Sequence, residues 1–345
     1  MEKIFDSKYP IVEAGMNPAS TLELALAVHE AGAFPCIALW AYLIETESDT
    51  GTLEFKPDIP AFDAALNEFV RSAGTNHLLV TLFSRHIFNL DVFNVLAAVK
   101  PRVIEVVMFD RTIYQNTPEQ LLKRFLICAK DHPIFSKYNW PVTVPEKEKV
   151  ADLRADILRN VVAEYRKIGV RTMIRSHEPR PIEKQGGYAI DGLFIKGFES
   201  GGRNARMSVW ENFSQQIAIN PSVPCIPFGG IGAPEHVKKY IDAGAQAVGV
   251  GTLFAASKES PLSMGVKERM VAASKRDISK IGETGQNALV FSKLTEPDDF
   301  NSNRSLRMGL FGDGTTGHVY AGHAIDHVKE IRPVKEIVEY LVSEL

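Results

Sequence analysis

Short apolar runs alternate with helical patterns along most of this chain. The predicted strands are the apolar runs at residues 9–16, 34–40, 77–83, 102–109, 170–174, 191–197, 223–230 and 247–252. Most are separated by predicted helices, at 20–33, 62–74, 90–99, 152–169 and 233–245. The runs are apolar throughout, which is typical of parallel strands covered on both faces. Eight βα units favour a closed barrel over an open sheet.

Two regions depart from the repeating pattern. Residues 110–150 form an insertion after the fourth strand, with a helix predicted at 118–131. From residue 263 the pattern becomes helical and polar, and we expect the helix there to reach residue 281. The sequence therefore predicts a (β/α)8 TIM barrel over residues 1–262 and a C-terminal helical subdomain over 263–345, packed near the barrel mouth.

The first predicted helix carries both of its end signals. Ser20 and Glu23 have the spacing of a capping box, in which each side chain accepts a backbone hydrogen bond at the helix start. Gly32 follows the last turn, where a glycine often ends a helix. We expect the helix to run between these residues.

Composition narrows the function classes. The 345 residues are 45% hydrophobic and carry a net charge of -3, which argues against nucleic acid as the main partner. The apolar runs are far shorter than the ~20 residues of a membrane span, and "MEKIFDSKYP" lacks the apolar core of a signal peptide. Cys36, Cys128 and Cys225 have no metal-ligand spacing and read as reduced thiols. We expect a cytoplasmic protein with no membrane partner and no bound metal.

Glycines gather at the ends of the last two predicted strands. Gly229, Gly230 and Gly232 follow the seventh strand, and Gly251 and Thr252 follow the eighth. In TIM barrels the loops after these two strands commonly bind phosphate, because backbone N–H groups reach an anion only where side chains are absent. The alternative is that the glycines only form tight turns. The spacing is not that of the Gly-x-Gly-x-x-Gly dinucleotide motif.

Four segments together resemble one family. "IPFGGIGAPEHVKKYIDAGAQAVGVGTLF" resembles the flavin phosphate site of nitronate monooxygenases and of the related flavin-dependent enoyl-acyl carrier protein reductases. "YPIVEAGM" is similar to the family's first strand, Pro-Ile-Val-Gln-Ala-Pro-Met, and "IKGFESGGR" to its signature Gln-Gly-x-Glu-Ala-Gly-Gly-His. "VYAGHAIDHVKEIRPVKEIVEYL" resembles its C-terminal tail. The segments occur in the family's order, and the resemblance is weakest over 110–150 and 255–315.

The resemblance implies an FMN cofactor at the C-terminal mouth of the barrel. The residues it places against the isoalloxazine are Ala14, Gly15 and Met16. Those it places at the phosphate are Ser200, Gly201, Gly202, Gly229, Gly230, Gly251 and Thr252. Lys196 either faces the flavin ring or lies in solvent at the strand end. Glu199 either orients the turn by hydrogen bonding or is a surface carboxylate.

Three departures from the family concern its chemistry. Arg203 stands where the family has a histidine that acts as a base or orients the substrate. Arginine stays protonated and is no general base, but its fork binds a carboxylate, nitronate or phosphate. Gly15 replaces a proline, and His323 replaces a glutamine. If a base is required, His177 and His86 follow strands at the same mouth, although a loop histidine is often structural.

Three functions follow from these observations. The first is an FMN-dependent oxidoreductase that oxidises a small carbon acid or nitronate with dioxygen. The second is an NAD(P)H-dependent enoyl-thioester reductase acting in trans, whose 110–150 insertion contacts a carrier protein. The third is a flavin-binding protein that lost its base together with the histidine. The sequence leaves the substrate, the redox partner and the oligomeric state open.

Overall fold

The computed structural model describes residues 4–16, 18–47, 53–83, 86–87, 89–107, 132–138, 150–182, 190–281, 286–291, 312 and 314–345. Eight parallel strands form its main sheet, in the order β1-β10-β9-β8-β7-β6-β5-β2. They are β1 (Ile11–Glu13), β2 (Cys36–Ala38), β5 (Leu79–Phe83), β6 (Val103–Val107), β7 (Arg171–Ser176), β8 (Gly192–Lys196), β9 (Cys225–Phe228) and β10 (Val248–Val250).

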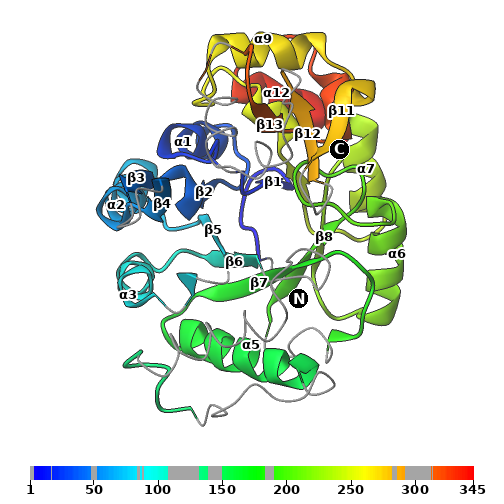
Figure 1. The fold of residues 1–345 in the computed structure, drawn as a ribbon. Helices are drawn as coiled ribbons and strands as arrows, with labels where there is room; N and C mark the ends of the chain where they lie inside the picture. The colour runs from blue at the N-terminus through cyan, green and yellow to red at the C-terminus, as the bar shows by residue number, and fades with distance from the viewer. Residues whose placement is uncertain are drawn as a thin grey trace.

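Backbone hydrogen bonds close this sheet between its first and last strands. The Glu13 amide donates to the Phe34 carbonyl oxygen and the Phe34 amide donates to the Ile11 carbonyl oxygen, both at 2.8 Å. Helices surround the sheet, as Figure 1 shows. They are α1 (Leu22–Glu30), α2 (Ile59–Ala73), α3 (Leu90–Val99), α5 (Val150–Lys167), α6 (Val209–Ile219), α7 (Pro234–Asp242) and the short α8 (Thr252–Ala255). The predicted (β/α)8 TIM barrel is confirmed.

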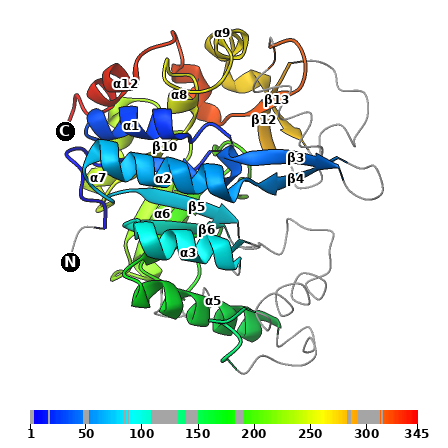
Figure 2. The ribbon, with the colours of Figure 1, turned by 90° about the vertical axis from the view of Figure 1, so that its left-hand side faces the viewer.

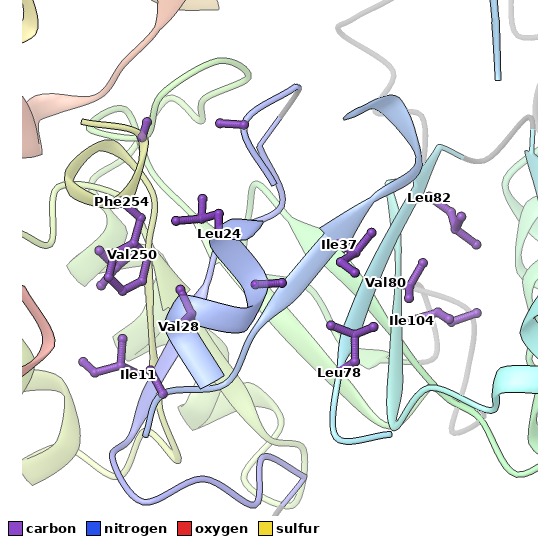
Figure 3. Close-up of a cluster of buried hydrophobic side chains, with 14 of the residues drawn as sticks. Ile11, Leu24, Val28, Ile37, Leu78, Val80, Leu82, Ile104, Val250 and Phe254 are labelled. Carbon is purple, nitrogen blue, oxygen red and sulfur yellow. The ribbon is translucent and has the colours of Figure 1, made fainter. Parts of the chain in front are cut away.

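The apolar strands serve two separate cores. Residues such as Ile11, Ile37 and Val80 point outward and pack with helix residues such as Leu24 and Val28, as Figure 3 shows. The neighbouring positions point inward and fill the barrel, where they form a second cluster that includes Phe34, Cys36, Leu79, Val103, Met173, Phe194, Ile226 and Phe228. Since both faces are buried, the strands contain apolar residues at consecutive positions.

The sequence missed three elements. α6 lies between the sixth and seventh barrel strands and begins with a capping box formed by Ser208 and Glu211. The hairpin β3 (Leu43–Glu47) and β4 (Leu53–Pro57) follows β2. A three-stranded antiparallel sheet joins β11 (Ile278–Ile281), β12 (Gln286–Val290) and β13 (His318–Tyr320). Figure 2 shows the hairpin and β12–β13 on the side toward which the arrows of β5 and β6 point.

The C-terminal region is therefore partly sheet. The helix expected to reach residue 281 ends earlier: α9 covers Met264–Ala272, and a 3-10 turn leads into β11. The final helix, α12 (Val334–Leu341), buries Val334, Ile337, Val338 and Leu341 and packs against α1, α7 and α8. The division of the chain at residue 262 stays a prediction. The helix expected at 118–131 and Cys128 lie outside the described residues.

The predicted capping box at Ser20 is wrong. α1 begins after Thr21, which makes no side-chain cap. The Ser20 hydroxyl instead donates to the Ala14 carbonyl oxygen at 3.1 Å and accepts from the Met16 amide at 3.0 Å. Ser20 thus holds the loop after β1, whose backbone groups compete with the helix for the same hydroxyl. Gly32, with φ of +80°, does follow the end of α1 as predicted.

Two further expectations concern the cysteines and membrane-spanning helices. Cys36 and Cys225 are buried free thiols, as predicted. In the part of the chain that the structure describes, every helix is too short or too polar to cross a membrane.

Candidate functional site

A belt of polar side chains lies above the apolar interior of the barrel. It consists of Thr81, Glu105, Arg175 and Lys196, from β5, β6, β7 and β8. Each residue follows an inward-pointing apolar residue two positions earlier (Leu79, Val103, Met173 or Phe194). Because side chains alternate along a strand, all four belt residues point into the barrel toward its C-terminal end.

An ion pair occupies the centre of the belt. The Arg175 guanidinium donates to both carboxylate oxygens of Glu105, at 2.5 Å from Nε to Oε1 and 3.1 Å from Nη2 to Oε2. The Thr81 hydroxyl donates to Glu105 Oε2 at 2.8 Å, and Glu105 is fully buried. A buried carboxylate needs such partners, so Glu105 and Arg175 neutralise each other. Sequence reasoning missed this pair, although a charge inside each of two apolar strands was a visible signal.

Lys196 differs from its neighbours in the belt. Its side chain is only 7% exposed, so the solvent-facing alternative is wrong. Among the described residues, its Nζ has no hydrogen-bond or ion-pair partner. Burial, followed by the positive charge of Arg175, lowers the pKa of Lys196 to about 7, and the charge of Glu105 partly offsets both effects. An amine with this pKa exchanges protons near neutral pH.

The structure brings the three predicted catalytic residues, Arg203, His177 and His86, to the same mouth. The Arg203 guanidinium lies over the Phe83 ring, with its Cζ 5.8 Å from the ring centroid. The His86 ring is 6.5 Å from Phe83. Burial, followed by the charges of Lys196, Arg175 and Arg203, lowers the pKa of His177 to about 3. His177 is therefore neutral at physiological pH and a weak base.

His86 belongs to an aromatic cluster. It is 7% exposed, and its ring lies 5.6 Å from that of Trp40, which meets Phe83 edge to face at 5.0 Å. This packing agrees with the structural alternative for His86. Its role as a base stays a prediction.

The glycine turns predicted to hold a phosphate form one continuous surface. Gly229 and Gly230, after β9, have φ of +124° and +70°. A Cβ on Gly229 would lie 2.2 Å from Ser200 Oγ, so the loops after β8 and β9 are in direct contact. A Cβ on Gly201 would lie 3.0 Å from the backbone of Ala321 and Gly322, in the C-terminal tail. Only glycine permits these approaches.

Several groups in these turns have structural partners. The Ser200 hydroxyl donates to the Phe228 carbonyl oxygen at 2.7 Å and accepts from the Gly197 amide at 3.2 Å. The Gly202 amide donates to the Asn287 carbonyl oxygen at 2.9 Å. Thr252 Oγ1 accepts from the Gly322 amide at 3.1 Å. These bonds shape the turns and engage the Ser200 hydroxyl and the Gly202 amide within the protein.

The loop after β1 connects the glycine turns to the polar belt. A Cβ on Gly251 would lie 3.5 Å from both Ala14 Cβ and Met16 Sδ. A Cβ on Gly15 would lie 2.1 Å from Thr81 Oγ1, and Arg175 Nη2 is 3.5 Å from the Gly15 carbonyl oxygen. Thr81 therefore explains why glycine stands at position 15. The residues predicted at the ring and at the phosphate are contiguous.

Two buried asparagines that sequence reasoning missed position the site. Asn212 Nδ2 donates to the carbonyl oxygens of Ser176 and Lys196, at 3.2 and 2.8 Å, and so joins the ends of β7 and β8. Asn287 Nδ2 donates to the carbonyl oxygens of Phe198 and Ser200, at 2.6 and 2.9 Å. Neither residue carried a sequence signal, because each contacts a segment distant along the chain.

Glu199 and His323 fix the same turn from outside. Glu199 Oε2 accepts from the Val209 amide at 2.9 Å, at the start of α6, which confirms that this carboxylate orients the turn. The His323 amide donates to the Glu199 carbonyl oxygen at 2.9 Å, and the His323 ring lies 5.8 Å from that of Phe198. The C-terminal tail is thus part of the site.

Comparison with known proteins confirms the resemblance seen in the sequence. The model of the nitronate monooxygenase family matches residues 151–290, which include β7 to β10. A probable nitronate monooxygenase of Staphylococcus aureus is 23% identical over 288 residues, covering 80% of this chain and 73% of its own. FabK of Thermotoga maritima has a TM-score of 0.68 at 21% identity, over 99% of this chain and 94% of its own. A nitroalkane oxidase of Streptomyces ansochromogenes has a TM-score of 0.63 at 19% identity, over 98% and 96%.

Proposed function

We propose, since this chain is related to the nitronate monooxygenases, that it is an FMN-dependent oxidoreductase that oxidises a small carbon acid or nitronate with dioxygen. The observation that carries the proposal is the continuity of three parts of the barrel mouth. The glycine turns after β8 and β9 contact each other, Gly251 after β10 adjoins the loop after β1, and that loop adjoins the polar belt. A long planar cofactor with one phosphate suits this arrangement.

The residues present fit FMN. Gly201, Gly229, Gly230 and Gly251 would hold the phosphate through their backbone, and Thr252 would close the same surface. Ala14, Gly15 and Met16 would lie along the ring system, with Lys196 on the barrel side. When bound, FMN would accept electrons from the substrate and pass them to dioxygen.

Positive charge at the mouth selects the substrate. Arg203 offers a forked donor, and Lys196 is cationic in part at neutral pH. The Glu105 carboxylate is held by Arg175. The Phe83 ring beneath Arg203 supports the guanidinium while leaving an apolar wall. These positive charges and the apolar wall favour binding of a small anion, or of a carbon acid that becomes an anion when it loses its proton.

The test is an anaerobic reduction screen of the protein loaded with FMN. Propyl-2-nitronate and NADPH are each mixed with the protein, and the visible flavin absorbance is followed. Bleaching by the nitronate supports the proposal. Bleaching by NADPH alone supports the enoyl-thioester reductase instead, and a flavin that neither compound bleaches indicates a binding protein.

We expect the purified or reconstituted protein to release FMN, and not FAD, on denaturation. The glycine turns suit a single terminal phosphate, whereas FAD continues into a pyrophosphate and an adenosine. Mass spectrometry of the released flavin checks this. Recovery of FAD, or failure to bind any flavin, would contradict the assignment.

We expect Gly251→Val to weaken FMN binding at least tenfold, which is about 1.4 kcal/mol. Gly251 has φ of -120°, so valine causes no left-handed strain, and its Cβ has room beside Ala14 and Met16. The valine methyl groups would instead separate the backbone from the phosphate. Flavin titration by fluorescence quenching measures the affinity, with thermal unfolding of the apoprotein as the folding check.

Ala64→Val is the control for this prediction. Ala64 is exposed within α2, where valine meets no left-handed strain. Its FMN affinity is expected to equal that of the unchanged protein. Equal affinities for all three proteins would mean that Gly251 only forms a turn.

A further inference from the structure

Lys196 is the least explained polar group of the barrel interior. It ends β8, two residues after Phe194, which packs in the inner cluster, and one residue after Ile195, which packs in the outer one. The strand alternation directs Lys196 inward. Its carbonyl oxygen accepts a hydrogen bond from Asn212 Nδ2 at 2.8 Å, which fixes the backbone from which the side chain extends.

Among the described residues, the charged groups around Lys196 form no ion pair with its amine. From β6 and β7, Glu105 and Arg175 face it, but both oxygens of Glu105 accept from Arg175. From the loop after β7, His177 faces the same cationic groups. A buried ammonium with no carboxylate partner among the described residues costs free energy, so the neutral amine is favoured. That is the reason for the pKa near 7.

The other candidates are poorer proton acceptors. Arginine, the residue at position 203, is not a general base. His177, with a pKa of about 3, takes up a proton only in acid. His86 packs edge to face or tilted against Trp40 and Phe83. Lys196 combines an inward direction, burial and a proton-free form at neutral pH.

We propose that the Lys196 amine takes the proton from the acidic carbon of the substrate. The inference rests on the proposed function, and it names carbon acids with a nitro or carbonyl group beside the C–H bond as the substrate class. The C–H bond breaks, the proton forms a new N–H bond on Nζ, and the electron pair stays on the substrate. The negative charge spreads onto the substrate oxygens, which Arg203 is placed to bind. A nitronate has already lost this proton and bypasses the step.

The test compares two probes that differ only in this proton. Protein loaded with FMN is mixed anaerobically with nitroethane or with preformed ethyl nitronate, and flavin reduction is followed. Lys196→Met should slow reduction by nitroethane at least about 100-fold, the usual contribution of a general base. Its reduction by ethyl nitronate should fall far less than its reduction by nitroethane, because the nitronate needs no proton transfer. Lys196→Arg should behave like Lys196→Met, because arginine keeps charge without releasing a proton.

The pH profile is a second readout. With the unchanged protein, reduction by nitroethane should rise with pH through a midpoint near 7, since the neutral amine is the active form. Reduction by the nitronate should lack this rise. Lys238→Met is the control: Lys238 is on α7 and pairs with Asp242 on the surface, and its replacement should affect neither probe.

The outcomes separate this inference from the proposed function. If Lys196→Met reduces flavin with nitroethane as fast as the unchanged protein, Lys196 is not the acceptor. If neither probe reduces the unchanged protein, the proposed function fails. In that case, deuterium exchange at the acidic carbon of nitroethane, followed by NMR in D2O, tests whether Lys196 accepts the proton. Exchange catalysed by the unchanged protein and lost in Lys196→Met supports the inference, and absence of catalysed exchange overturns it.

Discussion

Arg203→Ala is expected to weaken binding of the anionic substrate by about 2–4 kcal/mol, roughly 30- to 1000-fold. The guanidinium lies over Phe83 and contributes to the low pKa of His177, so it is part of the mouth. A charge-assisted, forked hydrogen-bond pair at a partly buried position is strong and cannot be replaced by water. Steady-state kinetics and titration with a nitronate measure the loss.

Arg203→Lys separates the fork from the charge. We expect it to be damaged almost as much as Arg203→Ala, because lysine presents a point charge with no planar fork. Arg203→His restores the residue that the nitronate monooxygenase signature carries, and a rise in nitronate oxidation would indicate that this protein has moved to another substrate. Normal turnover by Arg203→Ala would show that Arg203 is a structural residue.

Glu13→Gln is expected to raise the free energy of unfolding at pH 9 by roughly 5 kcal/mol. Glu13 is fully buried where β1 meets β2, and its Oε2 accepts from the Cys36 amide at 3.0 Å. Burial raises the pKa of Glu13 from 4.5 to about 8, against hydrogen bonds from Cys36 and Ser20 that lower it. This difference of 3.5 corresponds to roughly 5 kcal/mol at about 1.4 kcal/mol for each pH unit.

The sign of the pH dependence follows from the raised value. Below pH 4.5 the carboxyl is protonated in both the folded and the unfolded chain, so its ionisation does not affect stability. Between pH 4.5 and about 8 only the unfolded chain releases the proton, and the folded state loses stability as the pH rises. Glutamine cannot ionise, so the advantage of Glu13→Gln should be small at pH 5 and fully present above pH 8.

Urea unfolding at pH 5, 7 and 9, followed by tryptophan fluorescence, measures this difference. The control is Glu23→Gln, at an exposed carboxylate in the first turn of α1. Its effect on stability should not grow with pH. If Glu13→Gln and Glu23→Gln respond to pH alike, Glu13 is ionised in the folded protein and the seam between β1 and β2 is hydrated.

The barrel could be predicted because its signal is local. Each strand is a short apolar run, and each glycine turn follows such a run directly, as at Gly229 and Gly251. The missed sheet at β11–β13 shows the limit. The run from residue 263 to 281 has a helical pattern, but its last residues form β11, which is hydrogen-bonded to β12. β12 in turn pairs with β13, a strand far along the chain, and the local pattern contains no sign of that pairing.

The same limit applied to the site. The sequence placed Arg203, His177 and His86 at strand ends, and the structure brings them to one mouth. It also presented Ser20 as a helix cap, whereas the folded chain offers that hydroxyl to the Ala14 carbonyl oxygen and the Met16 amide. A local motif shows what a side chain is able to bind. It does not show which partner lies closer.

By itself the sequence determined the eight strands, the turns that follow them and the positions where glycine permits a close approach. These features depend on residues that are adjacent in the chain. Only the tertiary structure decided which charges in the barrel are paired. Glu105 and Arg175 lie on neighbouring strands and neutralise each other, while Lys196, one strand further on, is buried beside them. Pairing and burial depend on distances across the sheet, which packing fixes and sequence spacing does not contain.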